Sequence, residues 1–305
     1  MHAPPTRRSL LATTAAGALL AGCGGADWLN RLVPKHSYAL LPNQDYGPHL
    51  RHAADVYLPL SLVGAAPAPG APPPLVMFFY GGSWTRGDRA DYRFVGEALA
   101  ASGVVVVIAD HRLSPEVRYP DFLADCAAAT AWAWSQARTF GADPQRLFLM
   151  GHSAGAYNAA MLALDARWLH AVGRLPSRLA GWVGLAGVYD FLPIRNPEVQ
   201  QAFGWPGTPA DSQPLAHVSR VAPPALLLAP RNDDVVDPVR NTQGLADRLR
   251  AAGAPVQAQL LGGVNHATLP AAMARPLRWM APVLPQVLAF VTTPPQALAG
   301  AKPSA

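Results

Sequence analysis

The chain has 305 residues, of which 50% are hydrophobic and 14% are charged, so it can bury a large core and is not a disordered protein. The formal net charge is +5, but the basic residues form no dense cluster and no stripe alternating with aromatic residues, which argues against nucleic-acid binding. Two cysteines exclude a disulfide scaffold and a metal cluster made of cysteine alone.

The start of the chain has the pattern of an export signal. Arg7 and Arg8 precede a run of apolar and small residues, Leu10–Gly22, without any acidic residue. An apolar run of about 13 residues is too short to span a bilayer, which takes about 20. Leu20-Ala21-Gly22-Cys23 resembles the lipobox of bacterial lipoproteins, and Thr6–Leu11 resembles a twin-arginine export motif.

These patterns predict that residues 1–22 are a signal peptide, that Cys23 is acylated, and that the protein is membrane-anchored in the bacterial envelope, facing the periplasm. Two or three acyl chains anchor stably, because each buried CH₂ contributes about 0.8 kcal/mol. Loss of residues 1–22 removes Arg7 and Arg8 and no acid, which lowers the formal net charge from +5 to +3. Residues 23–50 are mixed in composition and are expected to form a lipidated tether.

Apolar strands alternate with helical segments in the rest of the chain. Strands are predicted at 55–58, 75–80, 104–109, 146–150, 180–186, 225–229 and 256–261, and helices at 91–102, 119–140, 154–164, 238–252 and roughly 271–291. Continuous apolar runs such as Leu75–Tyr80 are typical of strands buried on both faces of a parallel sheet. The alternation predicts one doubly wound, mostly parallel α/β domain, 51–293, and a flexible tail, 294–305.

Gly151-His152-Ser153-Ala154-Gly155 lies between a predicted strand and a predicted helix, which is the context of a nucleophile elbow. The tight turn needs small residues two before and two after the serine. The first N–H groups of the helix are unpaired and can stabilise an oxyanion. A serine hydroxyl is a weak nucleophile without a positioned base, so a histidine and a carboxylate are needed as well.

The base and the acid are expected in loops that follow later strands, because the chain order in such sheets is serine, acid, histidine. His266 follows the last predicted strand in a Gly-rich loop at the carboxyl edge of the sheet, where such sheets place their sites. Asp233 lies where an earlier loop first turns over this edge and is the predicted acid, with Asp234 as its rival. Asp237, directly before Pro238, is predicted to cap the next helix.

A further oxyanion donor is expected after the first long apolar strand, which ends in Gly81-Gly82-Ser83-Trp84. Consecutive glycines let the backbone approach a ligand and leave N–H groups exposed. The predicted oxyanion donors are the N–H groups of Gly81 and Gly82, with Ser83 as an alternative in the same turn, together with Ala154. Trp84 is predicted to line the substrate pocket, with packing beneath the loop as the alternative.

These motifs together resemble the α/β-hydrolase superfamily over roughly residues 50–292. The motifs are Tyr80-Gly81-Gly82-Ser83-Trp84, Asp110-His111-Arg112-Leu113-Ser114-Pro115, Gly151-His152-Ser153-Ala154-Gly155, the Asp233 loop and Asn265-His266. The nearest branch is the carboxylesterases with an H-G-G-x-W oxyanion motif, similar to hormone-sensitive-lipase-like esterases, bacterial xylan/feruloyl esterases and kynurenine formamidases. The resemblance implies a triad of Ser153, Asp233 and His266. Tyr80 departs from the motif's usual histidine, which bears on loop geometry and substrate preference.

The sequence therefore predicts a serine carboxylic ester hydrolase that works through an acyl-enzyme on small or medium esters. It is expected to need no metal, cofactor, nucleic acid or protein partner. An amidase or arylformamidase is the alternative with the same machinery, and a non-catalytic binding lipoprotein is the alternative outside it. Residues 189–224, an insertion after a predicted strand, are expected to form a small lid, with an ordinary packed loop as the alternative.

Overall fold

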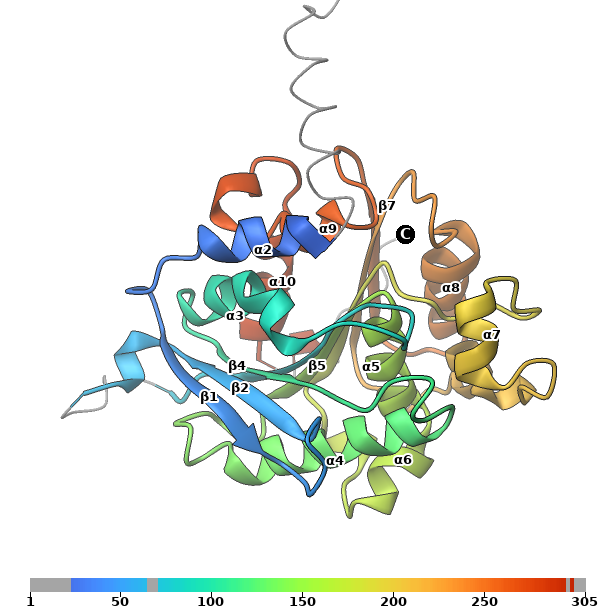
Figure 1. The fold of residues 1–305 in the computed structure, drawn as a ribbon, viewed down its shortest axis with the longest axis horizontal. Coiled ribbons are helices and arrows are strands. Elements are labelled where there is room, and N and C mark those ends of the chain that lie inside the picture. Colours follow the sequence, from blue (N-terminus) through green and yellow to red (C-terminus); the bar gives the residue numbers. More distant parts are fainter. Residues whose placement is uncertain (1–22, 65–70, 295–296, 299–305) are drawn as a thin grey trace, which may run out of the picture.

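The computed structural model describes residues 23–64, 71–294 and 297–298. Its centre is an eight-stranded sheet in the order β1-β2-β4-β3-β5-β6-β7-β8 (Figure 1). The strands are β1 (Ala39–Asp45), β2 (Ala53–Leu58), β3 (Leu75–Phe79), β4 (Val105–Ala109), β5 (Leu147–His152), β6 (Gly181–Leu185), β7 (Ala225–Pro230) and β8 (Val256–Leu261). β2 is antiparallel to β1 and β4, and all other neighbours are parallel, which confirms the predicted fold class.

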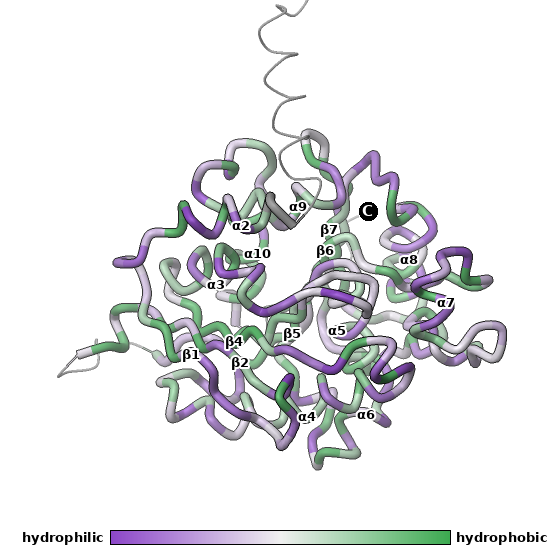
Figure 2. Tube along the Cα trace, in the orientation of Figure 1, coloured by the Kyte–Doolittle hydropathy of each residue, from purple (hydrophilic) through white to green (hydrophobic). Residues whose placement is uncertain are grey.

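Helices cover both faces of this sheet. They are α2 (Cys23–Arg31), α3 (Arg93–Ala100), α4 (Asp121–Gln136), α5 (Ala154–Leu164), α6 (Ala166–Ala171), α7 (Pro197–Phe203), α8 (Gly244–Ala251), α9 (Thr268–Ala271) and α10 (Val283–Thr292). In β3, Leu75, Met77 and Phe79 belong to the core cluster that includes residues of α4, α5 and α8, whereas Val76 and Phe78 belong to the cluster that includes residues of α3, α9 and α10. This alternation follows from the two-residue period of a strand and gives the sheet a hydrophobic core on each face. The central strands accordingly run through green, hydrophobic stretches of the chain in Figure 2.

The prediction that residues 23–50 form a tether is wrong, because this segment is part of the folded domain. Leu29 of α2 is only 2% exposed and belongs to the core cluster that contains α3 and α10. β1 then adds an edge strand to the sheet by pairing with β2. The folded domain therefore includes α2 and β1.

The ends of the chain are only partly described. The predicted signal peptide, 1–22, lies outside the described residues, as do 295–296 and 299–305 of the predicted flexible tail. Leu298, within that tail, is 5% exposed and packs in the core with α10, so the tail is not free throughout. Among the helices of the described residues, none is both long and apolar enough to cross a membrane.

The predicted lid segment, 189–224, connects β6 to β7 and contains α7 and short 3-10 turns. It lies over the carboxyl edge of the sheet, on the right in Figure 1. Phe191 and Phe203 of this segment pack against Trp84, with ring centroids 6.0 and 4.7 Å away. The segment is therefore held to the domain through an aromatic cluster.

Candidate active site

Ser153 lies in a strained turn between β5 and α5, with φ 53° and ψ −120°. A Cβ added at Gly151 would lie 2.1 Å from the carbonyl oxygen of Gly155, and one added at Gly155 would lie 2.1 Å from that of Phe79. Only glycine fits at both positions, which agrees with the predicted need for small residues there. Backbone strain of this kind persists where the surrounding structure fixes it, and here it exposes the serine at the sheet edge.

His266 and Asp233 complete a hydrogen-bonded series with Ser153. His266 Nε2 is 2.9 Å from Ser153 Oγ, and His266 Nδ1 is 2.8 Å from Asp233 Oδ2. These contacts join the β5–α5 turn to the loops that follow β7 and β8, at one edge of the sheet. A neutral imidazole with Nδ1–H facing the carboxylate leaves Nε2 free to accept the serine proton.

The Asp233 carboxylate is buried and ionised. Burial raises the pKa of Asp233, but the hydrogen bond and charge interaction with His266 and two backbone N–H donors outweigh this and lower it below its usual value. The donors are Val235 N and Val236 N, at 2.9 and 3.0 Å. Asp234 is exposed, and Asp237 caps the next helical turn by accepting from Val239 N and Arg240 N. Asp233 is thus the aspartate of this loop that orients His266.

The oxyanion loop differs from the prediction at Gly81. Its N–H donates to Tyr92 Oη at 3.3 Å, so it is not free for a ligand. The N–H groups of Gly82, Ser83 and Ala154 have no acceptor among the described residues. Gly82 has φ +136°, and an added Cβ would lie 2.1 Å from the carbonyl oxygen of Arg86. Because the Tyr92 hydroxyl accepts from the Gly81 N–H, the loop N–H groups without an acceptor among the described residues are those of Gly82 and Ser83, the alternative donor in this turn, rather than those of Gly81 and Gly82.

A chain of hydrogen bonds links the oxyanion loop to the base. Tyr92 Oη is 2.9 Å from His152 Nδ1, and His152 Nε2 is 3.0 Å from the carbonyl oxygen of His266. Each donor meets an acceptor only if Tyr92 donates to Nδ1 and Nε2–H donates to the carbonyl, which fixes the tautomer of His152. Burial, together with the charge interaction with His266, lowers the pKa of His152 to about 3, so its ring is neutral.

Sequence reasoning did not find Tyr92 or Arg51, since neither lies in a recognisable motif. Arg51 Nη2 donates to Tyr80 Oη at 2.6 Å and to the Gly87 carbonyl at 2.9 Å. Its Nε donates to the carbonyl of His111 at 2.7 Å. Tyr80 stands where the motif usually has histidine. Its hydroxyl is hydrogen-bonded to the Arg51 guanidinium, which also holds the Gly87 carbonyl and so orders the oxyanion loop.

Trp84 is both a packing residue and part of a cavity wall. Its ring is 2% exposed and stacks at 5.9 Å on Phe122, and its Nε1–H donates to Asn158 Oδ1 at 3.0 Å. It also lines a cavity that contains Ser153. A substrate chain in that cavity would contact a rigid, fully hydrogen-bonded indole.

Two grooves meet at Ser153. The α2-side groove, about 570 Å³, is lined by Ala26, Leu29, Gly81, Gly82, Ser83, Arg86, Gly87, Asp91, Tyr92, Phe94, His152, Ser153, Val235, His266, Ala267, Pro270 and Ala271. The lid-side groove, about 500 Å³, is lined by Ser83, Trp84, Ser153, Ala154, Val188, Asp190, Phe191, Pro193, Ile194, Arg195, Asn196, Val199, Val235, Val236, Asp237, Arg240 and Asn241. A hydroxyl at the junction of two grooves can attack a group whose two substituents bind in different grooves.

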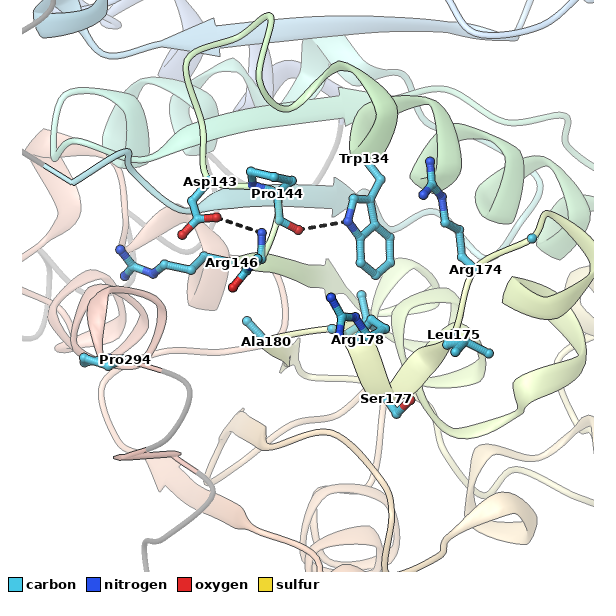
Figure 3. Close-up of a pocket in the computed structure, with 13 residues that line it drawn as sticks. Trp134, Asp143, Pro144, Arg146, Arg174, Leu175, Ser177, Arg178, Ala180 and Pro294 are labelled. Carbon is cyan, nitrogen blue, oxygen red and sulfur yellow. Dashed lines mark hydrogen bonds between the residues drawn. The ribbon is translucent and has the colours of Figure 1, made fainter.

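A larger cavity, about 790 Å³, lies at the opposite edge of the sheet, where β5 and β6 begin (Figure 3). We call it the amino-edge cavity. Arg146, Arg174 and Arg178 line it, and the Arg174 guanidinium lies 5.5 Å from the Trp134 ring centroid. No histidine is among the described residues that line this cavity, so Ser177 in its wall has no imidazole beside it.

The fold and the Ser153–His266–Asp233 geometry at the carboxyl edge define an α/β hydrolase. The family model described as alpha/beta hydrolase fold matches residues 76–270, and the chain belongs to this family. Esterase LipC of Mycobacterium tuberculosis is 31% identical over 247 residues, which cover 71% of this chain and 61% of LipC. Isoprenylcysteine alpha-carbonyl methylesterase ICME of Arabidopsis thaliana is 26% identical, covering 73% of this chain and 56% of ICME.

Solved structures agree with this fold assignment. Inhibited esterase B of Lactobacillus rhamnosis superimposes with a TM-score of 0.73 at 20% identity, covering 96% of this chain and 97% of that one. The esterase of Pyrobaculum calidifontis superimposes with a TM-score of 0.70 at 22% identity, covering 97% of this chain and 100% of that one. At these identities the likeness establishes the architecture alone.

Proposed function

We propose that the protein is a serine carboxylic ester hydrolase that acts through an acyl-enzyme on small or medium esters. The observation that carries the proposal is the series Ser153 Oγ, His266 and Asp233, with separations of 2.9 and 2.8 Å, at the junction of two grooves. Relatives at 31% and 32% identity bear the names Esterase LipC and Probable carboxylic ester hydrolase LipM, which supports the ester as the reacting group.

The reaction begins with attack of Ser153 Oγ on the ester carbonyl carbon, while His266 Nε2 takes the hydroxyl proton. Asp233 stabilises the imidazolium that forms. The free N–H groups of Gly82, Ser83 and Ala154 would hold the oxyanion, since they face no acceptor of the described residues. The carbon–oxygen bond to the alcohol then breaks, and the alcohol leaves with the proton of His266.

Water completes the cycle. The water oxygen attacks the acyl carbon while His266 takes a proton from the water. The bond between the acyl carbon and Ser153 Oγ then breaks, and Ser153 Oγ regains a proton from His266. The carboxylic acid is released and the free enzyme returns. Every proton transfer in this cycle is carried by His266.

Substrate class is tested by a profile of kcat/KM for p-nitrophenyl esters from acetate to palmitate, measured beside N-formylkynurenine. Because the grooves occupy about 570 and 500 Å³, we expect the highest values for short and medium acyl chains. Faster turnover of N-formylkynurenine than of every ester would favour the arylformamidase. No turnover of any of these compounds would favour a binding protein.

We also propose that the protein is exported and anchored through acylated Cys23, facing the periplasm. The Leu20-Ala21-Gly22-Cys23 motif after an apolar run supports this. Cys23→Ser is expected to move the protein from the membrane to the soluble fraction. Unchanged fractionation of the variant would contradict the anchor.

A further inference from the structure

Helix α2 forms one wall of the α2-side groove. Ala26 and Leu29 line the same cavity as Ser153 and His266. In Figure 1, α2 lies beside α3 and close to α9, whose Ala271 also lines the groove. The first helix of the described chain is thus part of the candidate active site.

Side-chain hydrogen bonds hold α2 in this place. Asn30 Nδ2 donates to the carbonyls of Ala90 and Asp91, at 2.7 and 3.1 Å, and Asn30 Oδ1 accepts from Phe94 N at 3.2 Å. A helix of nine residues is unstable alone, so these bonds and the buried Leu29 fix its position. α2 is therefore docked on the domain through both hydrogen bonds and apolar packing.

The outer surface of α2 and of the turn that follows it carries exposed apolar and basic side chains beside the exposed Asp27. Trp28 is 43% exposed and Leu32, one turn later, is 46% exposed. Arg31 and Lys35, close by in the chain, are also exposed. Exposed tryptophan and leucine beside basic residues are typical of helices that lie in the headgroup region of an anionic membrane.

The predicted acylation site adjoins this wall directly. Cys23 is the first residue of α2, and Ala26 follows it by three residues, which in a helix is a rise of about 4.5 Å. Acyl chains on Cys23 would therefore enter the membrane within one helical turn of the groove. A long tether, which would let the domain turn freely, is absent from the described residues after Cys23.

We propose that α2 binds an anionic lipid surface and thereby holds the opening of the α2-side groove against the membrane. The substrates are then amphiphilic acyl esters carried in the membrane. The exposed apolar Val235, 67% exposed and shared by both grooves, places a further apolar residue at this mouth. This inference rests on the proposed ester hydrolase and on the anchor at Cys23. It assigns the orientation of the site and the physical state of its substrate.

The test uses the acylated protein, extracted from membranes and reconstituted in vesicles of phosphatidylcholine and phosphatidylglycerol. Two rates are compared: hydrolysis of didecanoylglycerol carried in the vesicles and hydrolysis of water-soluble p-nitrophenyl butyrate. We expect the double variant Trp28→Ser, Leu32→Ser to lower the rate of didecanoylglycerol hydrolysis about tenfold, because the groove is no longer held against the lipid surface. The second rate should stay within about twofold, since neither side chain lines the groove.

A matched control changes two apolar residues of similar exposure elsewhere, Leu60→Ser with Leu175→Ser, which are 48% and 50% exposed. This control should leave both rates unchanged. Any of three results would overturn the inference. The first is an equal loss of didecanoylglycerol hydrolysis in the control, and the second is an unchanged ratio of the two rates in the α2 variant. The third is a wild type that hydrolyses only the soluble ester. Failure of the wild type to hydrolyse either ester would instead overturn the proposed function.

A second readout does not depend on catalysis. Brominated phosphatidylcholine in the vesicles should quench part of the tryptophan fluorescence of the wild type, and this part should be absent in Trp28→Phe. Equal quenching of the two proteins would mean that Trp28 does not lie in the lipid surface, which would contradict the binding of α2 to that surface.

Discussion

At the carboxyl edge of the sheet, Ser83, Trp84, Ser153 and Ala186 adopt positive φ, which makes four of the five non-glycine residues with this conformation in the described chain. The amino-edge cavity is larger, about 790 Å³ against 570 and 500 Å³, yet none of these residues lines it. Its arginines face no imidazole and no strained hydroxyl. Strained backbone and matched hydrogen bonds, rather than cavity size, therefore identify the reactive edge.

The largest expected effect distinguishes one serine at the carboxyl edge of the sheet from one at the amino edge. Ser153→Ala should lower kcat/KM for p-nitrophenyl butyrate by at least about 10³-fold, because the nucleophile is lost. Ser177→Ala, in the wall of the amino-edge cavity, should leave it unchanged. Full activity of the Ser153 variant would remove the distinction between the edges.

The next effect separates two adjacent carboxylates. Asp233→Asn should reduce kcat by up to about 10⁴-fold, because His266 loses the partner that holds its tautomer. Asp234→Asn should have little effect, since that side chain is exposed and makes no contact with His266. A larger loss in the Asp234 variant would reassign the acid.

Two glycines with positive φ provide a comparison at the backbone level. Gly82→Ala should lower kcat by about 10²-fold, because its Cβ would lie 2.1 Å from the Arg86 carbonyl and displace the oxyanion loop. Gly103→Ala, with φ +86° and open space around it near the start of β4, should change stability but not kcat. Comparable kcat losses in both would refute a specific role of the loop.

The Tyr92 hydroxyl tests the link between the oxyanion loop and the base. Tyr92→Phe should lower kcat about tenfold with little change in KM, because it frees the Gly81 N–H and leaves His152 Nδ1 without its donor. Tyr189→Phe removes a buried hydroxyl that has no hydrogen-bond partner among the described residues, and this variant should be neutral or stabilising. A neutral Tyr92 variant would mean that the chain of hydrogen bonds does not position the site.

The smallest effect concerns acid stability, measured as the free energy of unfolding between pH 7 and pH 4. Burial lowers the pKa of His152 to about 3 and of His111 to about 4, against 6.5 in the unfolded chain. Their contribution is complete above pH 6.5 and is lost as the pH falls, because only the unfolded state binds these protons. His152→Gln should make the free energy of unfolding depend less on pH in this range, by about 1.4 kcal/mol per pH unit. Arg178→Gln, at the amino edge, should leave the slope unchanged.

The sequence predicted the centre of this fold and the side chains that meet there. Buried strands such as β3 and β5 are continuous apolar runs, and the elbow glycines, Asp233 and His266 follow from chain order and turn chemistry. These features depend on local patterns that neighbouring residues specify.

Features that depend on distant partners were missed. β1 contains Pro42 and is half exposed, so it has no apolar alternation, and it becomes a strand only by pairing with β2. α2 carries two glycines and becomes a helix wall through contacts of Leu29 and Asn30 with the domain. The Gly81 N–H is directed to Tyr92, 11 residues away in the chain, and no motif encodes that contact.

The central claim is that Ser153 at the carboxyl edge is an activated nucleophile. Labelling of the purified protein with a fluorophosphonate probe, followed by intact mass and peptide mapping, tests this most directly. We predict one adduct per chain, located on Ser153, and no adduct in Ser153→Ala. Absence of labelling in the wild type, or an adduct on a different serine, would contradict the claim.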